Sequence, residues 1–436
     1  MSSKTIPFEK GQFLIGNLLP YSKDRLGFLI GLQKKHGGAF KVKIGPKKVT
    51  VLSDPKYVKY VMQTGHKSFV KKTNFDLFFG RSLFTTNGQE WKRQRKLLMP
   101  LMNLRYLETC LSVFESISKE NIENYISSGK NASDLRTLFS KITFDIILKT
   151  VIGIDYRQNY EFLDQAITTL THFVTKDKYR FFPLPEFLDR EKREFNDALK
   201  TLNDLIYKSL ETAKSSSDDF SFISQLLEYK RQNPEENINE DFIRDNIVTV
   251  MFAGYETTAM TFSFIAEMLA HTPKIQEDLV KEIRSFDKDF SVENLKDTPV
   301  LDAIISETMR LYPAGWAFTR VANEDVLAED IEIKKEEIVL ISPYMLGRNE
   351  KLHSNASEFN PSRFLDDSIN RDAYIPFGMG PRTCSGANFA ILELKVVLIT
   401  LLREYKFESC GDKCQVDARA TLFSKNGFNI KLVRNS

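Results

Sequence analysis

The chain has 436 residues, of which 42% are hydrophobic and 27% are charged, so it can bury a large core and is too apolar to be disordered. Its 61 Lys and Arg residues against 58 Asp and Glu residues give a net charge of +3, which provides no basic field for holding nucleic acid. Four cysteines in a chain of this length exclude a disulfide scaffold, and no secretory-signal pattern is present. We therefore expect a reducing, cytoplasmic setting.

A membrane-spanning helix needs about 20 mostly apolar residues, and the N-terminal region has only short apolar pieces broken by Gly16 and Asn17. The long apolar stretch from Ile247 to Ala270 contains Glu256 and Glu267, each of which costs a few kcal/mol near the centre of a bilayer. We interpret this stretch as part of a buried helix, about residues 241–270, and we expect no membrane anchor.

No internal repeat and no Gly/Ser-rich or Pro-rich linker divides the sequence, so we expect one large domain over residues 1–436. Helical periodicity dominates from Gln89 to about Ala270, and short strand-like runs lie on either side. The predicted fold class is mainly α with small β-sheets, an α+β arrangement. The expected elements outside the helical region are strands at Ala39–Ile44 and Val49–Leu52, a helix that starts at Asp54-Pro55, a helix that ends near Arg310, strands at Asp330–Ile333 and Ile338–Ile341, and a helix at Ala387–Arg403.

A long irregular stretch from Asn349 to Gly386 exceeds the usual length of a loop, which favours a functional role. Its last part, residues 377–386, reads Phe-Gly-Met-Gly-Pro-Arg-Thr-Cys-Ser-Gly and leads directly into an apolar helix. The glycines and the proline constrain the backbone around Cys384, and the start of a helix stabilises a negatively charged sulfur. This pattern favours a metal-binding thiolate over a buried structural cysteine, the usual state of a single Cys.

The loop matches the cysteine signature of the cytochrome P450 family at every fixed position, and three further segments resemble motifs of that family. These segments are Ala253–Thr257, similar to the oxygen-activation motif, Glu307–Arg310, similar to the Glu-x-x-Arg motif, and Phe359–Phe364, similar to its Arg-containing partner. The resemblance covers essentially the whole chain and implies the cytochrome P450 fold. The likeness is greatest to soluble bacterial members with eukaryote-like sequences.

The resemblance implies that Cys384 is the axial ligand of a haem iron. No Cys-x-x-Cys-His attachment motif is present, so we expect a non-covalently bound haem b. Trp91 and Arg95 stand four residues apart on one helical face and are donors only, which suits haem propionates, although a solvated basic helix explains the spacing equally well. By the resemblance, the haem contacts besides Cys384 are Trp91, Arg95, Arg320 and Arg382 at the propionates, and Ala253, Gly254, Phe377 and Gly386 elsewhere.

Gly254 lies inside the long apolar helix, where Gly costs up to about 1 kcal/mol relative to Ala, and this indicates close approach by a ligand. Glu256 and Thr257 add polar groups, and a simple helix kink at Thr257 is the alternative interpretation. The resemblance assigns an oxygen pocket here, with Thr257 and Glu256 as the catalytic pair that supplies protons.

Glu307 and Arg310 share one face of a helix, where an exposed pair contributes only a few tenths of a kcal/mol. The resemblance adds Arg363 and implies a buried network that holds the cysteine loop in place. We expect this network to be structural and not catalytic.

Aromatic residues gather in two irregular segments, and such clusters usually belong to the core. In the resembled fold these segments cover the distal pocket, which implies an apolar substrate. The predicted substrate-pocket residues are Phe75, Phe78, Phe79, Phe182, Trp316, Phe318 and Phe423. Lys71 and Lys72 could hold a substrate carboxylate, but such a pair is more often a solvated face.

The sequence therefore favours a haem-thiolate monooxygenase that inserts one atom of O2 into a hydrophobic small molecule, such as a fatty acid, terpenoid or polyketide-like compound. No flavin domain or iron–sulfur cysteine set is present, so we expect electrons from an external ferredoxin or flavodoxin and its NAD(P)H reductase. We also expect a monomer. Lys92, Arg93 and Lys96, with Arg348 and Lys351, are the expected docking face. The alternatives are a peroxide-driven peroxygenase and a non-catalytic haem-thiolate sensor.

Overall fold

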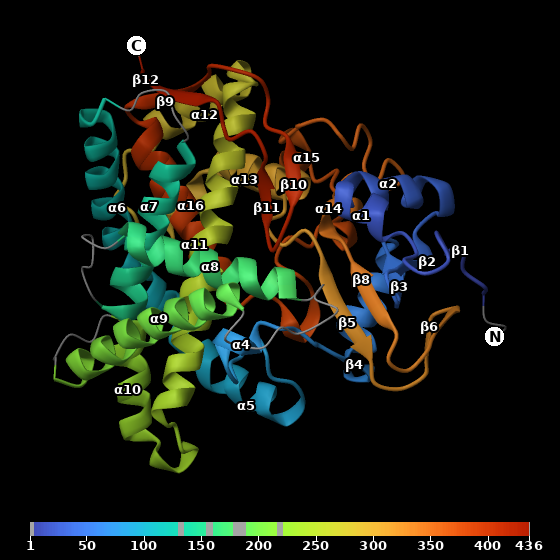
Figure 1. Cartoon of the computed structure of the whole chain (residues 1–436). Helices are drawn as coiled ribbons and strands as arrows, with labels where there is room; N and C mark the ends of the chain where they lie inside the picture. Colours follow the sequence, from blue (N-terminus) through green and yellow to red (C-terminus); the bar gives the residue numbers. More distant parts are fainter. Residues whose placement is uncertain (1–3, 130–134, 154–159, 178–188, 216–220, 436) are drawn as a thin grey trace.

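The computed structural model describes residues 4–129, 135–153, 160–177, 189–215 and 221–435. Figure 1 shows helices gathered on one side of the molecule, while the largest sheet lies on the other side beside the N-terminal helices. The predicted class, mainly α with small sheets, is confirmed. Phe182 and its aromatic neighbours lie outside the described residues.

Sixteen α-helices are assigned in the described part of the chain. Their bounds are α1 (Leu18–Lys23), α2 (Arg25–His36), α3 (Pro55–Lys59), α4 (Asp76–Phe79), α5 (Gly88–Leu98), α6 (Leu104–Ser127), α7 (Leu135–Ile147), α8 (Tyr160–Asp177), α9 (Arg190–Ser215), α10 (Phe222–Gln232), α11 (Glu240–Ala270), α12 (Pro273–Ser285), α13 (Pro299–Leu311), α14 (Pro343–Gly347), α15 (Ser362–Leu365) and α16 (Ala387–Leu402). Among the described residues, no helix is both long and apolar enough to cross a membrane.

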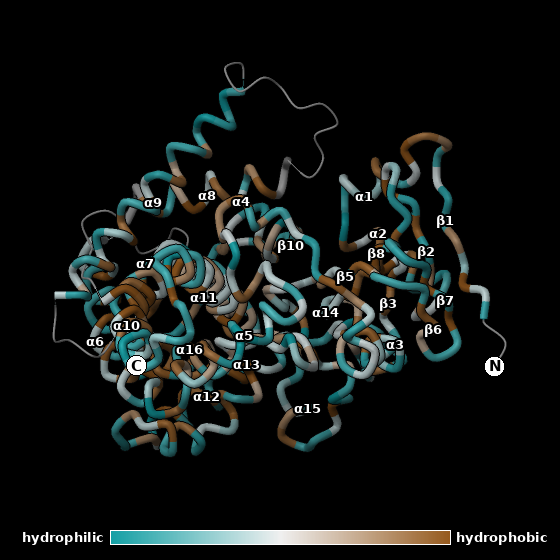
Figure 2. The backbone as a smooth tube through the Cα atoms, turned by 90° about the horizontal axis from the view of Figure 1, so that it is seen from below, coloured by the Kyte–Doolittle hydropathy of each residue, from teal (hydrophilic) through white to brown (hydrophobic). Residues whose placement is uncertain are grey.

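The long helix α11 runs through the middle of the molecule and organises the helical side. Its N-terminus is capped by the Asn239 side chain, which accepts a hydrogen bond from the Phe242 N–H over 2.8 Å. In Figure 2, hydrophobic residues concentrate where α7 and α11 lie together, whereas the peripheral helix α9 carries mostly hydrophilic residues. The stacked rings of Phe139 on α7 and Phe262 on α11, with centroids 5.0 Å apart, belong to this core.

A six-stranded sheet has the order β1-β2-β3-β8-β5-β4. Its strands are β1 (Phe8–Glu9), β2 (Ala39–Ile44), β3 (Lys47–Leu52), β4 (Phe69–Val70), β5 (Phe318–Ala322) and β8 (Ile338–Ile341). β2 and β3 are antiparallel around a turn in which Gly45 has a φ of 58°, while β3 and β8 are parallel, with Val49 paired to Ile338. This sheet therefore joins the N-terminal part of the chain to the segment that precedes the cysteine loop.

Three two-stranded sheets complete the described fold. They are β6 (Val326–Ala328) with β7 (Ile331–Ile333), β9 (Tyr405–Ser409) with β12 (Ile430–Arg434), and β10 (Val416–Ala418) with β11 (Leu422–Ser424). The predictions for β2 and β8 are confirmed residue for residue, and the central helix begins at Glu240, one residue before the predicted start. The sequence analysis missed β5 and the C-terminal strands β9 to β12.

Candidate active site

The cysteine loop, residues 377–386, packs against the π turn Tyr60–Thr64. Gly380 has a φ of +70°, and a Cβ added there would lie 2.2 Å from the Met62 carbonyl oxygen, so glycine is required at this contact. The Cys384 N–H donates to the Phe377 carbonyl oxygen over 2.9 Å, which closes the loop. Helix α16 begins directly afterwards, at Ala387.

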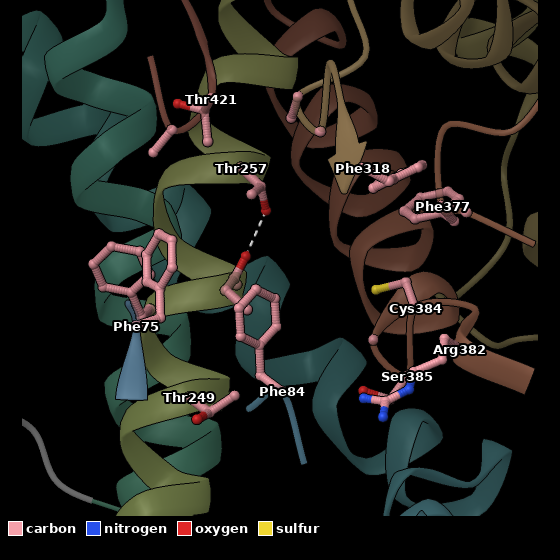
Figure 3. Close-up of a pocket in the computed structure, with 18 of the residues that line it drawn as sticks. Phe75, Phe84, Thr249, Thr257, Phe318, Phe377, Arg382, Cys384, Ser385 and Thr421 are labelled. Carbon is pink, nitrogen blue, oxygen red and sulfur yellow. Dashed lines mark hydrogen bonds between the residues drawn. The ribbon is translucent and has the colours of Figure 1, made fainter. Parts of the chain in front are cut away.

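Cys384 lines a cavity of about 600 Å³ in the middle of the molecule. Figure 3 shows its sulfur directed across this cavity toward α11, the helix that carries Thr249 and Thr257. Desolvation raises the pKa of the Cys384 thiol, while the Gly386 N–H and the Arg95 guanidinium act in the opposite direction. A cation bound to the sulfur would therefore be needed to keep it ionised.

The other three cysteines do not line this cavity. Cys110 is buried in the core, where desolvation raises the pKa of its thiol to about 12. Cys410 is exposed beyond β9, and desolvation raises the pKa of the Cys414 thiol to about 12. Cys384 is thus the one cysteine placed to bind a group inside the cavity.

The α11 wall brings together Ala253, Gly254, Glu256 and Thr257, all of which line the cavity. The Thr257 hydroxyl donates to the Ala253 carbonyl oxygen over 2.5 Å (Figure 3). Burial raises the pKa of the Glu256 carboxyl, and a hydrogen bond from the Thr421 hydroxyl partly offsets this shift. An acid and an alcohol therefore stand next to each other on the wall that faces Cys384.

Gly254 borders the cavity, as a site of ligand approach would, and it also lies close to the neighbouring helix α7. A Cβ added at Gly254 would lie 2.6 Å from the Cδ1 methyl of Ile147 at the end of α7. Glycine here permits close packing of α11 on α7, although Gly254 also borders the cavity. A costly mid-helix glycine therefore reports close approach of a neighbouring helix as readily as that of a ligand.

A group of four cations, which we call the inner cations, lines the cavity without a carboxylate partner among the described residues. The inner cations are Lys71, Arg95, Arg320 and Arg382. Arg95 donates to the Thr383 carbonyl oxygen over 3.1 Å, and Arg382 donates to the Thr86 carbonyl oxygen over 2.8 Å. Burial lowers the pKa of Arg320 to about 10, and burial together with the neighbouring guanidinium groups lowers that of Arg382 to about 10.

The sequence analysis did not include Lys71 in this group. Desolvation, together with Arg320 and Arg382, lowers the pKa of the Lys71 ammonium, whose Nζ lies 2.8 Å from the centroid of the Phe84 ring. Lys72 also borders the cavity, but its side chain is exposed and pairs with the exposed Glu336 over 2.8 Å. The two adjacent lysines therefore have different roles, and their shared assignment to a substrate carboxylate is not supported for Lys72.

A family model described as Cytochrome P450 matches residues 6–432. The chain belongs to the cytochrome P450 family. Among its curated relatives, "Probable cytochrome P450 4s3" from Drosophila melanogaster is 28% identical and the match covers 99% of this chain and 91% of the relative. "Cytochrome P450 3A6" from Oryctolagus cuniculus is 28% identical over 91% of this chain and 85% of the relative. "Protein LUTEIN DEFICIENT 5, chloroplastic" from Arabidopsis thaliana is 24% identical over 92% of this chain and 73% of the relative.

As a P450, the chain is an oxidoreductase of the monooxygenase class, which binds haem iron and uses O2 and redox partners. The relatives named above are eukaryotic proteins, and the predicted bacterial type stays a prediction. The cavity fits a haem on its own chemistry. It offers one thiol, a group of cations without counter-ions, and open space at Gly386, where an added Cβ would meet no atom within 4 Å. Trp91 and Phe377 line the same cavity, with the Arg382 guanidinium 4.3 Å above the Trp91 ring.

Some of the predicted substrate-pocket aromatic residues line the cavity, and others do not. Phe75, Phe79, Trp316 and Phe318 line the cavity of this P450, and so do Phe84 and Phe252. Phe78 does not line it, because its ring is 1% exposed and packs behind Phe79 and Phe252 in the core. Phe423 does not line it either, because the Arg419 guanidinium covers its ring at 3.8 Å.

Glu307, Arg310 and Arg363 form the buried charge network that the resemblance implied. Glu307 accepts from Arg310 Nε over 2.7 Å and from Arg363 Nε over 3.2 Å, and both ionic side chains of the first pair are 0% exposed. Arg310 donates to the carbonyl oxygens of Gly347, Ala356 and Glu358, and Arg363 donates to those of Ser354 and Asn355. These bonds hold the irregular segment before the cysteine loop, and they do not contact residues 377–386 themselves.

The predicted docking face includes one misplaced residue. Arg348 is half-buried, with its guanidinium 3.8 Å above the Tyr344 ring and donating to the Leu311 carbonyl oxygen. Lys92 and Lys96 are exposed on α5, while Arg93 pairs with Glu236 over 3.2 Å. Sequence spacing did not show that a cation near the expected face would turn inward onto tyrosines.

Glu393 on α16 is buried, and neither carboxylate oxygen has a hydrogen-bond partner among the described residues. Burial raises the pKa of this carboxyl well above its ordinary value. Cys110 on α6 is a titratable group near it, and burial raises the pKa of that thiol to about 12. Desolvation is the cause of the Glu393 shift, with no cation in the described part of the chain acting against it. The folded protein therefore retains a proton that the unfolded chain releases.

We expect Glu393→Gln to gain stability relative to the unmodified protein as pH rises. The pKa of Glu393 is higher in the folded protein than its value of about 4.5 in the unfolded chain. The protonated carboxyl therefore contributes its full stability below about pH 4.5, and this contribution is lost as the pH rises. Gln does not titrate, so the variant has no such loss. Between about pH 5 and pH 8 the advantage of the variant in the free energy of urea unfolding should therefore grow. The control Glu408→Gln, at a half-buried surface carboxylate that pairs with Lys406 and Lys431, should show no such gain. Parallel pH curves for Glu393→Gln and the unmodified protein would contradict the assignment.

Proposed function

We propose that this P450 is a haem-thiolate monooxygenase that oxidises a hydrophobic small molecule, with Cys384 as the axial ligand of a non-covalent haem b. The observation that carries the proposal is the position of Cys384, which faces the Glu256–Thr257 wall across one cavity whose side is lined by the inner cations. The inner cations would hold the two propionates, because guanidinium and ammonium groups are the natural partners of carboxylates.

When bound, a thiolate-ligated haem supplies electron density that favours cleavage of the O–O bond. The chain contributes the protons, since Thr257 offers a hydroxyl at the cavity wall and Glu256 stands beside it with a raised pKa. The rings of Phe75, Phe79 and Phe318 exclude water and provide an apolar surface for the substrate.

Electrons come, in this proposal, from a separate ferredoxin or flavodoxin and its NAD(P)H reductase. Lys92 and Lys96 on exposed parts of α5 would face an acidic partner, since α5 also carries the cavity residues Trp91 and Arg95. Monomeric state and a cytoplasmic setting stay predictions from the sequence.

Replacing Thr257 with Ala should uncouple cofactor consumption from product formation. In the proposed function, the Thr257 hydroxyl donates a proton during O2 reduction, whereas haem binding does not depend on it. NAD(P)H consumption should therefore continue in the variant, while the product formed per NAD(P)H falls by roughly 10-fold or more. Hydrogen peroxide should account for the missing electrons. The measurements are NAD(P)H consumed, peroxide released and product formed with one accepted substrate.

Thr249→Ala is the matched control, because Thr249 lines the same cavity on the same helix and also donates to the carbonyl oxygen four residues earlier, over 2.8 Å. Coupling should persist in Thr249→Ala and return in Thr257→Ser, which keeps a hydroxyl. Equal coupling in Thr257→Ala and the unmodified protein would remove Thr257 from the proton path.

A further inference from the structure

A second pair of cations, which we call the outer arginines, lines the cavity apart from the inner cations. The outer arginines are Arg25 at the start of α2 and Arg419 in the turn between β10 and β11. Arg419 is exposed and Arg25 is half-buried, so the pair lies where the cavity meets the solvent. None of the contacts described for the inner cations involves them.

Several contacts fix the outer arginines in place. Arg25 Nη1 donates to the Ala418 carbonyl oxygen over 2.6 Å, which ties α2 to the residue next to Arg419. The Arg419 guanidinium lies 3.8 Å above the Phe423 ring, and its carbonyl oxygen accepts from Trp316 Nε1 over 2.9 Å. Both guanidinium groups therefore belong to one corner of the cavity, built by α2 and the β10–β11 hairpin.

Neither outer arginine has a carboxylate within ion-pair distance among the described residues. The adjacent carboxylates have other partners, because Asp24 accepts from the Gly27 N–H over 2.9 Å and Asp417 pairs with Lys425 over 3.8 Å. Glu256 is the only carboxylate among the described residues that line the cavity. Burial raises its pKa, and the charge of Arg419 is one of the effects that act in the opposite direction. Neither guanidinium group is therefore held in an ion pair within the part of the chain that the structure describes, although Arg419 and Glu256 attract each other electrostatically.

We propose that the outer arginines bind the carboxylate of a substrate whose apolar body extends toward Cys384. Guanidinium groups bind carboxylates with paired hydrogen bonds. The same cavity is also lined by the apolar residues Ala314, Ala317, Phe318 and Leu340. The substrate class is therefore an apolar chain or ring system that ends in a carboxylate. This inference rests on the proposed function, and it predicts that oxidation occurs at the end of the molecule remote from the carboxylate.

The test compares dodecanoate with dodecanol, which has the same chain without the charge. Binding to the haem-loaded enzyme is measured by calorimetry and, separately, by the change in the haem absorption spectrum. Dodecanoate should bind roughly 10-fold or more tightly than dodecanol, and Arg25→Gln/Arg419→Gln should weaken dodecanoate binding by roughly 10- to 100-fold while dodecanol binding changes little.

The matched control is Lys23→Gln/Lys34→Gln, which removes the same charge from two exposed lysines that do not line the cavity. If both double variants weaken dodecanoate binding equally, the effect comes from overall charge, and the proposal that the outer arginines bind the carboxylate is overturned. So would equal binding of the acid and the alcohol, or no binding of either. The ferrous carbonyl spectrum is recorded on every sample, so a failure of thiolate ligation is recognised separately from a failure of the anchor.

Discussion

Replacing Cys384 with His should abolish the red-shifted Soret band of the ferrous carbonyl complex and reduce monooxygenase turnover to background. The loop closes through the Cys384 N–H, not through its side chain, so the backbone geometry should survive the change. Imidazole lacks the negative charge that a thiolate donates to iron, and the push toward O–O cleavage would be lost even where haem is retained. The measurements are haem content, the carbonyl spectrum and product formation.

Cys410→Ser is the matched control, because Cys410 is an exposed cysteine outside the cavity. It should keep the band and the turnover of the unmodified enzyme. An unchanged band in Cys384→His would show that another group ligates the iron and would overturn the proposed function.

Local sequence patterns were sufficient for much of this fold. β2 alternates apolar and polar residues in its second half, and β8 is a continuous apolar run, so the bounds of both strands could be predicted closely. The same holds for α11, which has an Asn cap at Asn239 and a long apolar body. β5 and the C-terminal strands were missed because they are short and are stabilised by partners distant in sequence, as in the pairing of β5 with β8 and β4.

The site shows the same division between local and long-range information. Cys384 lies within a continuous motif and could be found from sequence alone. Arg25 and Arg419 carry no local signal, since each meets the cavity only because distant segments pack together. The side-chain direction of Phe78 and Phe423 likewise depends on neighbours, Phe252 in one case and Arg419 in the other.

The network around Glu307 gives the largest expected effect on stability. The Glu307 carboxylate accepts from two guanidinium groups and from the Asn360 N–H over 2.8 Å, and it is fully buried. Glu307→Gln keeps the shape but removes the negative charge, which leaves Arg310 and Arg363 buried without a counter-ion. Removing one partner of a buried ion pair typically costs about 3–5 kcal/mol, so the urea midpoint should fall steeply.

Haem retention supplies a second measurement, because the two arginines hold the carbonyl oxygens of the segment that leads into the cysteine loop. Loosening that segment should release haem at lower urea in Glu307→Gln than in the unmodified enzyme. The control Glu293→Gln removes an exposed carboxylate that pairs with Lys296 over 2.6 Å, and it should leave both midpoints nearly unchanged because water screens such a pair. If Glu307→Gln and Glu293→Gln unfold alike, the buried network does not stabilise this region, and the order of the long irregular segment must come from its apolar contacts.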